Sequence, residues 1–96
     1  MSVVVVLEFK CKDETYEMVK STMTQILPDT VKFDGCEALH AAAEDATKTV
    51  VLYEVWDKIE SQQKYMGWRG ERGELDALAQ ALREPIAPRI LDVVSF

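Results

Sequence analysis

Three side chains between residues 65 and 69 have the chemistry needed to hold a flat anion. Tyr65 and Trp68 are three residues apart and Arg69 follows four residues after Tyr65, so a helix would bring all three to one side. Two rings and a guanidinium suit a planar phenolate, with Arg69 as the partner of its negative charge. The same spacing also fits an apolar stripe packed on a sheet, with Arg69 pairing outward with Glu71 or Glu74.

Proton transfer at such a site requires a base, and three side chains are candidates. His40 is the only histidine, and histidine is the side chain that changes charge near neutral pH. Glu8 and Glu54 lie among apolar neighbours in strand-like segments, where partial burial strengthens the hold of a carboxylate on a proton. The alternatives are a structural or exposed histidine, and glutamates that place charge at an interface or a sheet edge.

Trp56 stands where a strand is expected to turn into a helix, so its ring fits either the wall of a binding site or the core. Its indole N–H needs a hydrogen-bond partner if the ring is buried. The single histidine and the separated Cys11 and Cys36 provide no cluster with metal-ligand spacing, so we expect no metal site. The glycine-rich run at 67–73 follows a helix instead of opening one, which disfavours a phosphate-binding loop.

The composition indicates one small acidic domain, residues 1–96. The chain has 11 basic and 17 acidic side chains and a formal charge of −6, which disfavours nucleic acid as a partner. The apolar run at residues 3–7 has no basic segment before it and ends at Glu8. Neither a signal peptide nor a membrane span fits this pattern, and we expect a cytoplasmic protein. Cys11 and Cys36 are then expected to stay reduced, without a disulfide bond.

Hydrophobic periodicity predicts four strands, and strict alternation predicts which side chains share a face. The strands are expected at Ser2–Cys11, Cys36–Glu44, Thr49–Trp56 and Ile90–Phe96. In the second strand, alternation places His40 on the same face as Cys36 and Ala38. The chemistry available to His40 therefore depends on which side of the sheet this face occupies.

Three helices are predicted from the spacing of apolar residues and from capping signals. The first is expected to begin after an N-cap at Asp13 and to stop at Pro28. The second is expected to run from Asp57, which forms a capping-box pattern with Glu60, to about Arg69. The third is a short helix that ends before Pro85 and is marked by Leu75, Leu78 and Leu82.

This order of elements is the split βαβ pattern of a ferredoxin-like α+β fold, with helices on only one face of the sheet. The first, third and fourth strands are nevertheless apolar on both faces, so an isolated monomer is expected to expose a row of apolar side chains that includes Val4 and Val6. At about 25 cal/mol per Å², a few hundred Å² of such surface favours association by several kcal/mol. We therefore expect a homodimer formed through the sheet faces. The alternative is that a terminal segment or a curled loop covers the sheet face without helices.

Three short runs resemble the antibiotic biosynthesis monooxygenase family. They are Gly35-Cys36, the Val-Leu-Tyr-Glu-Val-Trp run at 51–56 and the Tyr-Met-Gly-Trp-Arg run at 65–69. The resemblance covers nearly the whole chain and implies a dimeric α+β barrel with a pocket between each sheet and its helices. It also implies oxygenation of a phenolic or quinol-type aromatic by O2 without metal, flavin or other cofactor. The protein then excludes water, orients the ring, takes one proton and stabilises the phenolate.

Two departures from the family pattern bear on function. Many relatives have histidines on the second helix, where this chain has Tyr65 and Trp68, and haem-degrading relatives have an asparagine where this chain has Glu8. Haem degradation is therefore disfavoured. We expect a monooxygenase-like enzyme for a small aromatic substrate, and the alternative is a non-catalytic dimeric barrel that binds a small apolar ligand. The catalytic candidates are His40, Glu54 and Arg69, and the substrate-binding candidates are Trp56, Tyr65 and Trp68.

Overall fold

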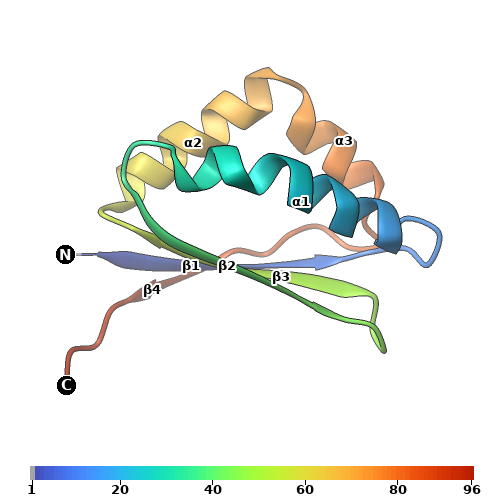
Figure 1. Cartoon of the computed structure of the whole chain (residues 1–96), viewed down its shortest axis with the longest axis horizontal. Helices are drawn as coiled ribbons and strands as arrows, with labels where there is room; N and C mark the ends of the chain where they lie inside the picture. Colours follow the sequence, from blue (N-terminus) through green and yellow to red (C-terminus); the bar gives the residue numbers. More distant parts are fainter. Residues whose placement is uncertain (1) are drawn as a thin grey trace.

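The computed structural model describes residues 2–96 and consists of one antiparallel sheet with three helices on one face (Figure 1). The strands are β1 (Val3–Lys10), β2 (Cys36–Glu44), β3 (Thr49–Trp56) and β4 (Arg89–Asp92). The helices are α1 (Tyr16–Val31), α2 (Ile59–Glu71) and α3 (Glu74–Gln80). The strand order β2-β3-β1-β4 confirms the predicted ferredoxin-like α+β fold. No helix within residues 2–96 is long and apolar enough to cross a membrane.

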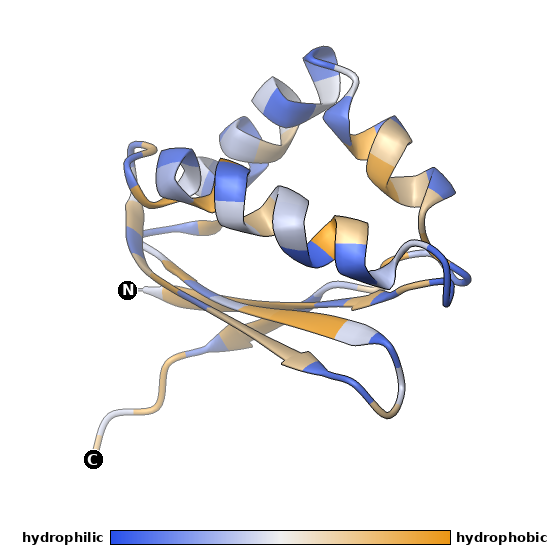
Figure 2. Cartoon of the chain, turned by 45° about the vertical axis from the view of Figure 1, so that its right-hand side comes forward, coloured by the Kyte–Doolittle hydropathy of each residue, from blue (hydrophilic) through white to orange (hydrophobic). Residues whose placement is uncertain are grey.

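The core lies between the sheet and the helices and follows from alternation in the two central strands. Leu7 and Phe9 of β1 pair with Leu52 and Val50 of β3, and all four side chains are buried on the helix-covered face. Figure 2 shows that hydrophobic residues concentrate in the strands, whereas the helices mix hydrophobic and hydrophilic residues. Burial of each such apolar side chain stabilises the fold by roughly 1.5–3 kcal/mol. From α1, the buried apolar residues are Tyr16, Val19 and Met23.

The predicted limits of α1 were wrong at both ends. The helix begins at Tyr16, and the hydroxyl of Thr15 donates to the carbonyl of Ala81 (2.5 Å) without capping the helix, so Asp13 is not the N-cap. The helix also continues through Pro28 to Val31. A proline this close to the helix end removes only one backbone hydrogen bond. The buried hydroxyl of Thr30, 2.6 Å from the hydroxyl of Tyr65, ties the last turn to α2.

The start of α2 also differs from the prediction. Its N-cap is Lys58, which makes no side-chain capping bond, and α2 ends at Glu71, two residues beyond the predicted end. The Asp57 carboxylate accepts a hydrogen bond from the hydroxyl of Ser61 (2.6 Å), so the expected capping box with Glu60 does not form. Asp57 lies just before the helix and bonds to Ser61 in its first turn, so the two side chains satisfy each other.

The last two elements are shorter than predicted, because of the backbone partners that other parts of the chain do or do not provide. α3 ends at Gln80, and Leu82 instead forms a bridge with Cys11. β4 ends at Asp92, which pairs with Val3, the first residue of β1. Beyond that pair β1 offers no further backbone partner, so the predicted extension of the strand to Phe96 was wrong.

A β-bulge in β2 changes the predicted faces of this strand. Cys36 lies opposite Trp56, while Ala38 lies opposite Val55, so the register shifts by one residue between Cys36 and Ala38. Cys36 consequently packs against the core, and His40 lies on the opposite face. The prediction that Cys36 and His40 share a face was wrong, since period-two alternation fails across a bulge.

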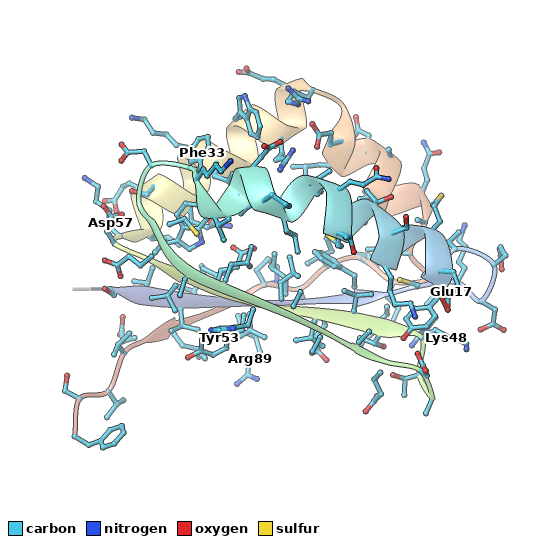
Figure 3. The ribbon with its side chains drawn as sticks, viewed as in Figure 1. Glu17, Phe33, Lys48, Tyr53, Asp57 and Arg89 are labelled. Carbon is cyan, nitrogen blue, oxygen red and sulfur yellow. The ribbon has the colours of Figure 1, made fainter. Side chains whose placement is uncertain are left out.

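The sheet face opposite the helices is uncovered (Figure 1). Tyr53 of β3 is 46% exposed on this face, Leu91 of β4 is 38% exposed, and Val6 and Val51 are half-buried. Figure 3 shows Tyr53 and Arg89 on the side of the sheet away from the helices. We call this surface the open face. The homodimer expected from the sequence depends on it and stays a prediction.

Candidate functional site

A cavity of ≈ 520 Å³ lies between the sheet and the helices. Its floor comes from the central strands, through Leu7, Phe9 and Leu52. Its walls come from all three helices and are mostly aliphatic or thioether side chains, among them Met18, Met23, Ile26, Met66, Leu75 and Leu78. A cavity of this size and character suits a small apolar ligand.

Glu54 of β3 contributes a carboxylate to the floor of this cavity. Its side chain is 1% exposed on the helix-covered face of β3, and the indole Nε1 of Trp56 donates to its Oε1 at 3.0 Å. Within residues 2–96, Oε2 has no hydrogen-bond partner, although every fully enclosed side-chain polar atom has one. Oε2 therefore faces the cavity that Glu54 lines.

The environment of Glu54 strengthens its hold on a proton. Burial raises the pKa of Glu54 above the ordinary value of 4.5, and the hydrogen bond from Trp56 only partly offsets this effect. A buried carboxylate of this kind takes a proton from a bound molecule more readily than an exposed one does. Glu54 is thus the group in the cavity best suited to proton transfer.

Arg69 lies at one end of the cavity and is already engaged with the protein. The side chain is 3% exposed, its Nε donates to the hydroxyl of Tyr65 (2.9 Å), and its Nη1 pairs with Glu74 (2.7 Å). Its Nη2 donates to the carbonyl of Ile26 (2.9 Å) and to the hydroxyl of Thr30 (3.3 Å). Arg69 therefore joins α2 to the last turns of α1 and to the start of α3.

Glu74 completes this cluster with a second arginine. Arg72 also donates to the Glu74 carboxylate, beside the ion pair with Arg69. Burial alone would raise the pKa of Glu74, but the hydrogen bond from Arg72 and the charge of Arg69 outweigh it and lower the pKa. The pair Arg69–Glu74 corresponds to the alternative interpretation of the sequence, in which Arg69 binds a nearby acid.

The three aromatic candidates take different positions around the site. Tyr65 lines the cavity. Trp56 is 0% exposed and does not line the cavity, and its ring centroid lies 5.4 Å from that of Tyr65. Trp68 is half-buried outside the cavity. The centroid of its ring lies 5.6 Å from the ring centroid of Phe33 and 4.7 Å from the guanidinium of Arg69. Only Tyr65 of the three is placed to touch a ligand in the cavity.

His40 lies apart from the other candidates. It is exposed on the open face, where it pairs in register with Tyr53, and the two ring centroids are 6.4 Å apart. Glu8, the other base considered, is exposed on the same face. The fold therefore brings Glu54, Tyr65 and Arg69 to one cavity and places His40 and Glu8 across the sheet from it.

Sequence reasoning missed the groups that α1 contributes. Thr30 and the carbonyl of Ile26 hold Arg69, and Met18 and Met23 line the cavity. The two methionines in the predicted first helix were a signal, because flexible thioethers often line adaptable binding sites. Thr30 follows Pro28, and the expectation that the helix ends at that proline concealed it. Among residues 2–96, no cluster of three histidine, cysteine, aspartate or glutamate side chains is placed to hold a metal ion.

Several solved structures are similar to this chain. A putative antibiotic biosynthesis monooxygenase from Deinococcus radiodurans is 15% identical, with a TM-score of 0.83 over 98% of this chain and 94% of its own. A monooxygenase from the gene ActVA-Orf6 of Streptomyces coelicolor, in complex with the ligand Nanaomycin D, is 18% identical, with a TM-score of 0.78 over 99% and 89%. The NE2512 protein of unknown function from Nitrosomonas europaea is 12% identical, with a TM-score of 0.83 over 99% and 91%.

These likenesses define the fold class of the chain. No model of a protein family matches the sequence, and no curated protein matches it. The chain has the α+β fold of solved antibiotic biosynthesis monooxygenases, and the resemblance inferred from the sequence is confirmed at the level of the fold. Because this fold also occurs in a protein of unknown function, the activity must be argued from the cavity.

Proposed function

We propose that this chain is a cofactor-independent monooxygenase-like enzyme that binds a small planar aromatic in the cavity and uses Glu54 as its base. One observation carries the proposal: a carboxylate that is 1% exposed turns its unpartnered oxygen toward an apolar cavity of ≈ 520 Å³. The similar Streptomyces coelicolor monooxygenase, which was crystallised with a small organic ligand, supports the choice of reaction class.

The reaction is illustrated by an anthrone, whose ring carbon loses a proton to give an electron-rich enolate. Oε2 of Glu54 takes that proton, and the enolate gives electrons to O2. A carbon–oxygen bond forms, the peroxide anion takes the proton back from Glu54, and the resulting hydroperoxide loses water to leave a quinone. The substrate thus loses two hydrogens and gains one oxygen atom, and the second oxygen atom leaves as water. The apolar walls exclude solvent from the intermediates.

Arg69 supports this chemistry by its charge. Its guanidinium lines the same cavity but donates to Tyr65, Glu74, Thr30 and the carbonyl of Ile26. A fixed positive charge at the end of an apolar cavity lowers the energy of an enolate without direct pairing. Arg69 is accordingly proposed as an electrostatic and positioning residue.

Oxygen uptake tests this proposal directly. Metal-free and flavin-free protein is mixed with a panel of anthrones and hydroquinones, and dissolved oxygen is followed. We expect turnover of at least one compound, and Glu54→Gln lowers its rate by about 100-fold or more. Glu8→Gln, which changes an exposed glutamate of the neighbouring strand, retains the rate. Equal rates in wild type and Glu54→Gln would contradict the role of Glu54.

A non-catalytic binding protein is the second candidate, and the engagement of the polar groups favours it. Arg69 and Tyr65 already make hydrogen bonds within the protein, whereas Glu54 is a buried residue of the cavity lining with an unpartnered oxygen. The same panel separates the two functions. Saturable binding without oxygen uptake on any compound would favour the binding protein.

We also propose a homodimer formed through the open face. Tyr53 and Leu91 on this face are 46% and 38% exposed, Val6 pairs with Tyr53, and Val51 lies two residues before Tyr53 on the same strand. Facing a second copy would remove these side chains from water, at about 25 cal/mol per Å² of apolar surface. The cavity lies on the other side of the sheet, so each protomer would keep a complete site.

A further inference from the structure

We infer that the cavity selects neutral planar ligands that carry a hydroxyl or another hydrogen-bond donor and rejects the matching carboxylates, with Glu54 as the residue that decides. The inference rests on the proposed function for its site. It adds the charge and the polar group of the ligand, which neither the fold nor the similar structures assign.

The first step concerns the hydrogen bond that the cavity offers. Oε1 of Glu54 is taken by Trp56, and Oε2 faces the cavity without a partner within residues 2–96. An ionised carboxylate only accepts hydrogen bonds, so a ligand meets it best with an O–H or N–H donor. A ligand without a donor leaves Oε2 buried and unpaired, which costs binding free energy.

The second step concerns the cation that an anionic ligand would need. Arg69 donates from all three of its nitrogens, to Tyr65, Glu74, Thr30 and the Ile26 carbonyl. A ligand carboxylate would have to displace Glu74 from Arg69, and Glu74 would then keep Arg72 as its partner but lose the buried one. Because Arg69 is 3% exposed and already held by the protein, this exchange costs binding free energy.

The third step concerns the total charge around the ligand. The charged side chains that line the cavity are three acids, Asp29, Glu54 and Glu74, and two arginines, Arg69 and Arg72. Both arginines are paired with Glu74. The lining therefore has a net charge of −1 when all five groups are ionised, and an anion entering the apolar interior meets Glu54 as a like charge.

The binding of three naphthalene compounds tests the inference. 1-Naphthol is a neutral donor at neutral pH, 1-naphthoic acid is an anion, and naphthalene has no polar group. Intrinsic fluorescence quenching or calorimetry gives the dissociation constant of each compound with the wild-type protein. We expect 1-naphthol to bind about 100-fold more tightly than 1-naphthoate and about tenfold more tightly than naphthalene.

Variants assign the selectivity to Glu54. Glu54→Gln removes the charge and adds a donor, so the ratio between 1-naphthol and 1-naphthoate is expected to shrink by about tenfold or more. Glu8→Gln, on an exposed glutamate of the open face, is expected to leave the ratio unchanged. Circular dichroism confirms that each variant is folded, and the three-compound comparison in wild type stands even if a variant unfolds.

The outcomes separate this inference from the proposed function. Equal affinity for 1-naphthol and 1-naphthoate, no binding of either by folded protein, or an unchanged ratio in Glu54→Gln would overturn the inference. Selective binding without oxygen uptake on any anthrone or hydroquinone would overturn only the enzymatic activity. Oxygen uptake that accepts carboxylated and neutral substrates equally would overturn only the selectivity.

Discussion

The indole Nε1 of Trp56 lies 3.0 Å from Oε1 of Glu54, and the two side chains are 0% and 1% exposed. They are two residues apart on β3 and therefore point to the same, helix-covered face of the sheet. Trp56 thus fills the core and fixes one carboxylate oxygen, which leaves the other oxygen to the cavity. Its part in the site is to orient Glu54.

The buried position of Glu54 predicts a specific dependence of stability on pH. The folded protein holds the proton of Glu54 more tightly than the unfolded chain does, because burial raises the pKa above 4.5. The stability that the protonated group contributes is present in full below the unfolded pKa and is lost as pH rises through the folded pKa. Glu54→Gln should remove this loss, so its stability relative to wild type increases with pH.

Urea denaturation at a series of pH values between about 4 and 8 measures this difference. Glu60→Gln is the matched control, since Glu60 is exposed on α2 and lies outside both the cavity lining and the open face. A stability difference between Glu54→Gln and wild type that stays constant across the series would show that Glu54 does not titrate in the buried position assigned to it.

Arg69 is predicted to be a major source of stability. Arg69→Ala removes a buried guanidinium from its ion pair with the half-buried Glu74 and removes the hydrogen bonds to Tyr65 and Thr30, so it should destabilise the fold by about 2–3 kcal/mol. Arg72→Ala removes a half-exposed partner of the same carboxylate and should cost less than about 1 kcal/mol. Urea denaturation compares the two variants. Similar losses of stability in both would contradict the role of Arg69 in joining α2 to α1 and α3.

The open face is predicted to hold the dimer together. Tyr53→Lys places a charge in the middle of this face and should convert a dimer into a 10.9 kDa monomer in light scattering. Val31→Lys is the matched control, because Val31 at the end of α1 is equally exposed, 46%, but lies on the helical layer. A monomeric wild type, or a Tyr53→Lys variant that stays dimeric, would speak against association through this face.

His40 is predicted to have no part in chemistry at the cavity. It lies on the open face beside Tyr53, with the sheet between it and Glu54. His40→Ala should therefore change the rate of oxygen uptake by less than about twofold, provided that the dimer stays intact. Light scattering on the same sample checks that condition. A large loss of rate in a dimeric His40→Ala protein would contradict this prediction and would indicate that His40 acts as the base.

Much of the fold follows from local patterns in the sequence. The order of strands and helices was predicted from periodicity, and the bounds of β2 and β3 agree with the expectation. The errors arise where tertiary contacts override a local signal. Thr30 binds Tyr65 and so stabilises a helical turn beyond Pro28, and a bulge after Cys36 reverses the faces of β2. Neither contact is visible in a window of neighbouring residues.

The candidate site was predicted only in part, for a related reason. Spacing placed Tyr65 and Arg69 on one side of α2 and identified Glu54 as a glutamate among apolar neighbours. The face of the sheet that holds His40 depends on the bulge, and the partners of Arg69 come from α1 and α3 as well as from α2. Such long-range pairing decides which candidate groups meet, and it is set by the packing of the helices on the sheet.

The central claim is that a donor-bearing aromatic binds in the cavity against Glu54. Nuclear magnetic resonance of protein labelled with carbon-13 at the side-chain carboxyl of glutamate observes this contact directly during titration with 1-naphthol. We predict a saturable shift of the Glu54 resonance, with Glu8 unaffected. A titration that moves the resonance of Glu8 on the open face, and leaves that of Glu54 unchanged, would contradict the account.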